Sequence, residues 1–501
     1  MEAGMAFLLM IAIPLLGAPL IYLIGRLVER KRPHHNPARW AALILLLAAM
    51  YPFSIAAQAV IVQGAVVSFS LGVIALQLDG VGLLLAALVF ALGVMVTLFS
   101  GTYLQKEEHQ EKYYSLLSAM IAAMIGLGCA RDLFNLWVWF ELMAVASYPL
   151  VAFHRHTPAA LEAGVKYLVQ SAVGSALVLV GIALVFGQTG TLILEEIRTN
   201  APLTSVILAA GALFVVGFGV KAALVPLHTW LPDAHSQAPS GISAMLSGVV
   251  IEAGLIALLR ALAALFAVSH LWGVFLLGFA ALNTLLGNLM ALRQTQVKRM
   301  LAFSSLSHMG YIVLGIGCAF VFGSQDAAAG GFFHILTHGL MKGLAFLAAG
   351  GLLYGLYIAN GKHTPLLVED LNGAAGRYPL AAFTFSVALL GLGGIPPLAG
   401  FMSKWQIFVG GFETRQGWAI VLVIFAALNS VLSLGYYAPL INRMYRNAPS
   451  PLVEQGKPLF VWMNMALLIL TIGVVGLGFW PSLAGWLTQP AAQSLLSALG
   501  G

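Results

Sequence analysis

Three ionisable side chains stand at intervals of four residues in the otherwise apolar segment FFHILTHGLMKGLAFL. They are His334, His338 and Lys342, and this spacing places them on one face of a helix. A histidine pair at this spacing is also a metal-binding pattern, but no acidic or cysteine ligand accompanies it. A line of histidine and lysine suits proton relay better. Taken singly, each histidine also fits a structural role in a helix core.

Two lysines lie beside glycines and prolines within hydrophobic runs. Gly217 and Gly219 precede Lys221 and Pro226 follows it, and a similar cluster precedes Lys404. Such residues predict interrupted helices, which a membrane tolerates only where protein or a water-filled cavity surrounds the backbone. Burial lowers the pKa of a lysine, and a neighbouring carboxylate raises it again. We therefore expect Lys221 and Lys404 to carry protons. Lys221 is not expected to snorkel to the membrane surface, because its position is predicted away from a helix end.

Two carboxylates also lie within apolar runs. Glu141 stands near the middle of LFNLWVWFELMAVASY, and Glu252 lies in LSGVVIEAGLIALLR. A charge at mid-bilayer costs about 2.5–3.5 kcal/mol on insertion scales and marks a functional residue by default. We expect Glu141 to tune the proton affinity of a nearby lysine, the alternative being a structural pairing. A secondary set of polar positions comprises His228, His235 and His308.

These buried charges stand out because the chain is so apolar. Of its 501 residues, 60% are hydrophobic and 8% are charged, and the mean hydropathy is +0.94. A soluble domain carries about 25% charged residues, so a bilayer must be the solvent for most of this chain. The net charge of +6 does not indicate nucleic acid, because the basic residues are scattered through short loops. Cys129 and Cys318 show no metal-type spacing and predict no disulfide framework.

Apolar runs of spanning length recur along the chain, and we predict about fourteen membrane-spanning helices. The first run has no basic residues before it and no small-residue cleavage site before Arg26, so it is expected to be an uncleaved span. The predicted ranges are 5–25, 40–62, 80–100, 114–130, 133–153, 163–187, 204–224, 239–262, 271–292, 299–322, 328–356, 379–411, 417–441 and 459–480.

Loop charge predicts the orientation. The first loop, RLVERKRPHHNPAR, is strongly basic and is expected to be cytoplasmic, and an even number of spans then places both termini outside. Only Arg131, Arg198 and Arg415 fall in outer loops. The basic residues expected inside are Arg26, Arg30, Lys31, Arg32, Arg39, Lys106, Lys112, Arg155, Arg293, Lys298, Arg299, Lys362, Arg377, Arg443, Arg446 and Lys457.

Several segments together resemble a known family. The chain carries FELMAVASYPLVAF, KAALVPLHTWLPDAHSQAPSGISAMLSG, LNTLLGNLMALRQTQVKRMLAFSSLSHMGYIVLG, HILTHGLMK and GIPPLAGFMSKW. These are similar to the antiporter-like subunits of respiratory complex I, whose family includes subunits of Mrp sodium/proton antiporters and of membrane-bound hydrogenases. The resemblance runs from about residue 75 to about 445, and its run PLHTWLPDAH is highly specific.

The resemblance implies an all-α polytopic fold of about fourteen helices, with two inverted five-helix repeats and broken seventh and twelfth helices. The predicted regions are an N-terminal three-helix segment (1–112), a first repeat (113–262), a second repeat (263–445) and a C-terminal helix and tail (446–501). Interrupted spans in corresponding positions of two halves are also the pattern of an inverted-repeat transporter.

The resemblance also implies roles for the polar residues. Glu141 matches the fifth-helix glutamate of the family, and Lys221 matches the seventh-helix lysine that pairs with it. Lys404 matches the charged residue of the broken twelfth helix, and His228 falls within the signature after the first break. The polar positions that link the two halves are matched by His334, His338 and Lys342.

One position departs from the family pattern. Many members have a lysine where this chain has Glu252. A carboxylate there reverses the local charge and puts the usual relay in doubt. We expect Glu252 to take part as an acid, either by receiving a proton from Lys221 or by pairing with Lys342.

The function implied is that of a proton-translocating subunit in a complex I-like ion-pumping complex of a bacterial or archaeal cytoplasmic membrane. Expected partners are other membrane subunits, including homologous ones, the lipid bilayer and protons, with sodium as the alternative ion. The alternatives are an Mrp-type cation/proton antiporter subunit and a structural subunit that does not conduct. No nucleotide loop, cluster-type cysteine or quinone chemistry is recognisable, so no cofactor, metal site, or redox or hydrolytic catalytic residue is expected in the chain.

Overall fold

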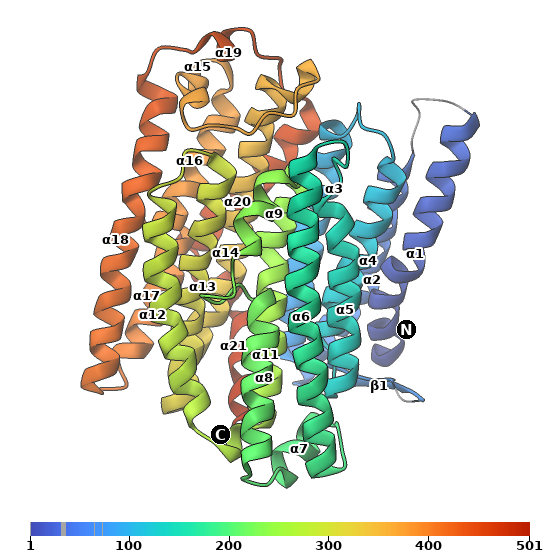
Figure 1. Ribbon diagram of the computed structural model, residues 1–501, viewed down its shortest axis with the longest axis vertical. Coiled ribbons are helices and arrows are strands. Elements are labelled where there is room, and N and C mark those ends of the chain that lie inside the picture. The colour runs from blue at the N-terminus through green and yellow to red at the C-terminus, as the bar shows by residue number, and fades with distance from the viewer. Residues whose placement is uncertain (1, 32–36, 65, 73, 501) are drawn as a thin grey trace.

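The computed structural model describes residues 2–31, 37–64, 66–72 and 74–500. Long helices dominate it, and most run along the vertical direction of Figure 1 in one bundle. Within the described ranges, eleven helices are long and apolar enough to cross a membrane, which confirms the prediction of a helical membrane protein. Arg32 and its neighbours in 32–36, part of the predicted basic loop, lie outside the described residues.

The first three helices flank a small hairpin that departs from the predicted all-α fold. Strands β1 (Val67–Leu71) and β2 (Ile74–Leu78) pair antiparallel in a connection too short for a spanning helix. Asp79 caps the next helix by accepting the backbone N–H of Gly82 at 2.8 Å. The helices around the hairpin are α1 (Ala3–Lys31), α2 (Ala38–Gln63) and α3 (Gly80–Tyr103).

The predicted first repeat folds into helices with one interruption and one irregular turn. A π-helical turn, Leu246–Val250, lies in the helix predicted for 239–262 and immediately precedes α11. Such turns occur mostly as single bulges, frequently at functional sites. The helices of this region are α4 (Gln110–Gly128), α5 (Leu133–Val151), α6 (Pro158–Thr189), α7 (Leu194–Asn200), α8 (Ser205–Lys221), α9 (Trp230–Gln237), α10 (Ser240–Met245) and α11 (Ile251–Ala264).

The rest of the chain continues the bundle. The helix predicted for 379–411 is divided in two by residues 394–398. The helices are α12 (Leu271–Ala291), α13 (Val297–Phe322), α14 (Gln325–Leu356), α15 (Ala374–Arg377), α16 (Pro379–Gly393), α17 (Ala399–Phe412), α18 (Gly417–Arg446), α19 (Pro451–Glu454), α20 (Val461–Phe479) and α21 (Gly485–Ala498). Short 3-10 turns cover Phe266–Val268, Ile358–Asn360, Glu369–Leu371 and Pro481–Ala484.

The helices differ in how deeply they lie in the bundle. The spanning window of Ser240–Ala264 is 100% buried, and the windows of α13 and α14 are 89% buried. The window of α18 is only 33% buried, as expected of a helix that presents most of its surface to lipid. The predicted ionisable residues of α11, α13 and α14 therefore lie at the centre of the protein, where lipid does not reach them.

The connections between helices gather at two opposite ends of the bundle. Asp79 and Arg131, which precede α3 and α5, line one cavity, whereas Glu107, His154 and His363, which follow α3, α5 and α14, come together elsewhere. The full length of α3 separates Asp79 from Glu107. Both marked chain ends lie in the lower half of Figure 1, opposite α15 and α19. The chain thus passes back and forth between the ends, as the predicted alternation requires.

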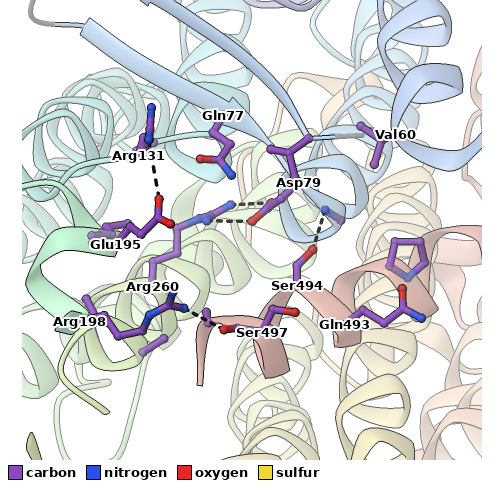
Figure 2. A pocket seen from close by; sticks show the side chains of 18 of the residues that line it. Val60, Gln77, Asp79, Arg131, Glu195, Arg198, Arg260, Gln493, Ser494 and Ser497 are labelled. Atoms are coloured by element: carbon purple, nitrogen blue, oxygen red, sulfur yellow. Dashed lines mark hydrogen bonds and ion pairs between the residues drawn. The ribbon is translucent and has the colours of Figure 1, made fainter. Parts of the chain in front are cut away.

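The cavity at the Asp79 end holds about 500 Å³ and is lined by ion pairs and hydrogen bonds, shown in Figure 2. Arg260 of α11 donates to both carboxylate oxygens of Asp79, at 3.1 and 2.8 Å. Arg198 donates to the carbonyl of Ser497 at 2.8 Å. Bidentate guanidinium–carboxylate pairs are among the stronger polar contacts. The contacts of Arg260 hold the N-terminal end of α3 against α11. The contact of Arg198 holds α21 against α7.

Candidate functional site

Lys221 is fully buried at the C-terminal end of α8. The expectation that it lies away from a helix end is wrong, because the helix stops at this residue. Snorkelling is still excluded, since its ammonium is inside the protein. Its Nζ donates to the hydroxyl of Tyr167 at 2.8 Å and to Ser171 Oγ at 3.3 Å, and it lies 4.3 Å from the ring centroid of Tyr167. Hydroxyls and an aromatic face therefore hold this ammonium.

Side chains from other helices satisfy the backbone of the break after Lys221. Asn283 of α12 accepts the N–H of Val225 at 2.9 Å and donates to the carbonyl of Ala223 at 3.1 Å. The indole of Trp230 donates to the carbonyl of Val220 at 2.7 Å. An interrupted helix leaves backbone groups that must find partners within the protein. The helix interruption after Lys221 is therefore stabilised by specific hydrogen bonds. Its position agrees with the break that the glycines and proline around Lys221 predict.

Glu141 stands in the middle of α5 and is half-buried. Its Oε1 atom is buried and makes no hydrogen bond within the described chain. No ion pair within 4.0 Å joins it to Lys221 among the described residues. The pairing that the family resemblance implies is therefore not a direct contact in this structure.

Glu252 forms a buried hydrogen bond with a partner that the sequence did not indicate. Its Oε1 lies 2.7 Å from Nδ1 of His338, and both side chains are fully buried. The expected pairing with Lys342 is not made, because the ammonium of Lys342 contacts Leu301 and Ser304 instead; proton transfer from Lys221 stays a prediction. Close approach of two glycines, Gly248 and Gly339, brings α14 beside the π turn that precedes Glu252. A Cβ on Gly248 would lie 2.9 Å from the Gly339 carbonyl.

His308 joins the two histidines of α14. Its Nδ1 lies 3.0 Å from Nε2 of His334, and its ring stacks on that of His338 with centroids 5.2 Å apart. His308 was predicted only as a secondary position, because it belongs to α13 and helical spacing relates residues of one helix only. The structure places it in the middle of the row.

The row continues from His334 towards Lys404 on the second interrupted helix. His334 Nδ1 lies 2.8 Å from Oγ of Ser403, the residue before Lys404. Lys404 donates to the Leu392 carbonyl and to Ser430 Oγ, both at 2.8 Å. The Leu392 carbonyl is free to accept because α16 ends one residue later. Ser403 was not predicted, and only its place beside a buried lysine could have suggested it.

Lys342 makes no hydrogen bond to the histidine row among the described residues. Its Nζ donates to the carbonyl of Leu301 at 2.8 Å and contacts the hydroxyl of Ser304, which in turn contacts the hydroxyl of Tyr437. The predicted line from His338 to Lys342 is therefore wrong as a line of contacts. Lys342 instead connects α14 to hydroxyls of α13 and α18.

The remaining predicted histidines lie apart from this row. His228 is nearly buried beside Phe303, and its Nδ1 has no partner in the described chain. His235 is fully buried and stacks on Phe346 with ring centroids 4.7 Å apart. Lys298 was predicted as a loop charge because Arg299 follows it, but it is buried and contacts the carbonyl of Ala238.

The contacts therefore form one row of buried titratable and hydroxyl side chains. It runs from Glu252 through His338, His308 and His334 to Ser403, next to Lys404. Neutral imidazole takes a proton at one nitrogen and releases one from the other. Lys221 is not joined to this row by a hydrogen bond in the described part of the chain. It lies one helix away, since a Cβ on Gly254 of α11 would meet the Lys221 Cβ at 3.0 Å.

Helices of spanning length around a buried row of lysine, glutamate and histidine define a polytopic membrane protein of the antiporter-like class. The family described as NADH:quinone oxidoreductase/Mrp antiporter, TM, matches residues 130–430, and this chain belongs to that family. The resemblance found in the sequence is thereby confirmed.

Relatives and solved structures agree with this assignment. The chain is 35% identical over 429 residues to F(420)H(2) dehydrogenase subunit N of Methanosarcina mazei, covering 84% of this chain and 85% of that one. It is 31% identical over 493 residues to NADH-quinone oxidoreductase subunit N 2 of Rhizobium meliloti, covering 97% and 96%. A chain of the membrane-bound sulfane sulfur reductase, an archaeal respiratory membrane complex, superposes with a TM-score of 0.87 at 28% identity, covering 99% of this chain and 100% of that one.

Proposed function

We propose that this chain is a proton-translocating, antiporter-like subunit of a redox-driven, complex I-like membrane complex. The observation that carries the proposal is the row from Glu252 to Ser403, in which four titratable side chains from three central helices follow one another inside the protein. Ionisable residues buried at membrane depth are costly and mark ion pathways. The relatives named for dehydrogenase and quinone oxidoreductase subunits support redox drive.

The arrangement of helices supports a two-fold plan with fourteen membrane crossings. In region 113–262 the fourth crossing is α8, which ends at Lys221, and in region 263–445 it is the α16–α17 pair, which carries Lys404. These would be the broken seventh and twelfth helices of two inverted repeats, flanked by 1–112 and 446–501. Equivalent interruptions beside a lysine in both halves are the pattern expected of such repeats.

In the proposed mechanism, Lys221 holds a proton while its hydroxyl partners and the nearby Glu141 stabilise the ammonium. A shift of Glu141, driven by a neighbouring subunit, weakens this hold. The proton then reaches Glu252 across α11 and passes to His338, His308 and His334. Lys404 receives it through Ser403 and releases it at the second interrupted helix. Lys342 stabilises the central hydroxyls from the side and does not stand in the row.

Orientation and partners are part of the same proposal. The basic connections, including the one that follows α3, face the cytoplasm, and both chain termini face outside. Adjacent subunits include homologous antiporter-like chains and the redox arm. An Mrp-type sodium/proton antiporter is the alternative function within the family. Sodium prefers oxygen ligands, whereas imidazole nitrogens form most of the row, so protons are favoured.

The test is proton transport by the assembled complex in sealed vesicles. We expect His308→Leu to abolish proton uptake driven by the electron donor, while His228→Gln, which lies off the row, preserves it. Uptake that depends on a sodium gradient and not on the electron donor would support the Mrp-type alternative. Full redox-driven uptake in His308→Leu would refute the row as the proton path.

A further inference from the structure

Three side chains that the transport proposal does not use converge at the end of the bundle opposite the Asp79 cavity. Glu107 follows α3, His154 follows α5 and His363 follows α14. One carboxylate oxygen of Glu107 lies 3.7 Å from His154 Nδ1, and the other lies 3.5 Å from His363 Nε2. The ligand atoms of all three residues lie within 4.8 Å of one another. Three separate connections thus present a two-histidine, one-carboxylate set.

We propose that Glu107, His154 and His363 form a binding site for a divalent transition-metal ion, with Zn²⁺ as the best fit. Two histidines and a glutamate are a known protein ligand set for zinc. In a tetrahedral site with bonds of about 2.0–2.2 Å, neighbouring ligand atoms lie about 3.3–3.6 Å apart. The two carboxylate oxygens lie 3.5 and 3.7 Å from the histidine nitrogens, and one ligand atom from each residue lies within 4.8 Å of the others, so side-chain rotations would close the set around one ion. Magnesium and calcium would require more oxygen ligands.

Backbone contacts hold the three connections in place. Lys106 donates to the carbonyl of Ala359 at 2.9 Å, which ties the segment with Glu107 to the segment with His363. The Thr157 hydroxyl donates to the carbonyl of His154 at 2.8 Å. A ligand set that is already positioned binds an ion at a lower entropic cost.

Glu107 and the two histidines also interact electrostatically. Burial opposes ionisation of Glu107, but a hydrogen bond and the charges of the surrounding histidines hold its pKa below its usual value. Burial lowers the pKa of His363, the charge of His154 lowers it further, and Glu107 opposes both. Metal ions bind an ionised carboxylate and a neutral imidazole.

The site borders a cavity of about 200 Å³ that reaches the buried Lys298. His154 and His363 both line this cavity, together with Tyr103. His363 is 37% exposed, so an ion has access from solvent, and the fourth ligand position is left for water. A bound ion would link the two halves of the chain, because His154 belongs to the first repeat and His363 to the second.

The competing explanation is a charge cluster that binds no metal, and direct metal binding separates the two. The complex is purified, stripped with a chelator and titrated with Zn²⁺, and the bound metal is counted for the wild type and for the triple variant Glu107→Gln, His154→Gln, His363→Gln. We expect one Zn²⁺ fewer per complex in the triple variant. Each single variant should weaken binding by at least about tenfold, the lower range for losing even an indirect metal partner.

The matched control is His156→Gln, an exposed histidine in the same connection as His154, which should retain the full Zn²⁺ count. Substitution of Co²⁺ provides a second measurement, because a tetrahedral site with nitrogen ligands gives visible absorption that the triple variant should lack. Equal Zn²⁺ counts in the wild type and the triple variant would overturn the proposal, as would Co²⁺ spectra that do not differ. Neither measurement depends on proton transport, so the proposed function and this site fail independently.

Discussion

His338 Nδ1 lies 2.7 Å from Glu252 Oε1 at the centre of the bundle, and both side chains are fully buried. Removing one partner of a buried hydrogen bond leaves the other polar group unsatisfied. Glu252 is the residue that departs from the pattern expected from the family resemblance, and its hydrogen-bond partner is a second titratable side chain. Both His338 and Glu252 can bind and release a proton.

Glu252→Gln should therefore lower proton transport without preventing assembly. The amide keeps the shape and a hydrogen bond to His338, but it neither carries a charge nor accepts a proton. A positioned proton-transfer group contributes about 10²–10⁴-fold, and we expect a loss in that range. Redox-driven proton uptake in vesicles measures it, and Glu413→Gln at the exposed end of α17 is the control. Unchanged uptake in Glu252→Gln would remove this residue from the row.

His308 provides the second prediction, because its Nδ1 contacts His334 and its ring stacks on His338. His308→Gln keeps a polar side chain but cannot pass a proton from one ring nitrogen to the other. We expect it to block transport as completely as His308→Leu, although its effect on stability should be smaller. Comparison of uptake with the thermal unfolding midpoint tests this. If His308→Gln conducts like the wild type, a hydrogen-bonding side chain is sufficient there.

Much of the fold was predictable because spanning length and apolar composition are local properties. The breaks beside Lys221 and Lys404 were predictable for the same reason, since glycine and proline act on their own helix. The partners of Glu252 were not, because they depend on how closely α14 approaches the π turn through Gly248 and Gly339. Helical spacing therefore predicted that Lys342 would continue the line of the histidines. The packing of α14 on α13 lets its ammonium contact the Leu301 carbonyl, and this packing cannot be read from the spacing.

Lys221 is expected to depend on its hydroxyl partners as well as on Glu141. Tyr167→Phe removes the 2.8 Å hydrogen bond while keeping the ring face and the stacking on Trp230. An unpaired hydrogen-bonding group in a buried site costs about 1–3 kcal/mol, so the ammonium should lose its proton more readily and transport should fall. Lys221→Ala should abolish transport outright. Proton uptake by both variants over a range of pH measures this, and wild-type profiles in both would show that Lys221 is not a carrier.

Gly254 tests how closely the break packs on α11. A Cβ at this position would lie 2.8 Å from the backbone nitrogen of Ala222, which cannot rotate away. Overpacking of this kind typically costs about 1–3 kcal/mol, so Gly254→Ala should lower the unfolding midpoint and disturb Lys221. Gly187→Ala is the matched control, because nothing lies within 4 Å of its Cβ. Equal midpoints for the two variants would show that the break can move away from α11.

The final prediction concerns pH and the ionic contacts of α9. Asp233 Oδ2 lies 3.1 Å from Lys166, and its other oxygen contacts Arg299. Burial alone would raise the pKa of Asp233, but hydrogen bonds and charge from Arg299 and Lys166 hold it below its usual value. A group with a lowered folded-state pKa stabilises the protein above its unfolded pKa of about 3.9, and this stabilisation is lost as the pH falls through the folded value.

Asp233→Asn should accordingly unfold at a lower temperature than the wild type at pH 6–8, by about 1 °C for a chain of 501 residues if the contacts contribute on the order of 1 kcal/mol. The difference should shrink below about pH 4, where the wild-type carboxyl also becomes neutral. Thermal unfolding of the purified complex over this pH range measures it. A difference that stays constant with pH would mean that Asp233 acts through hydrogen bonding and shape, and not through its charge.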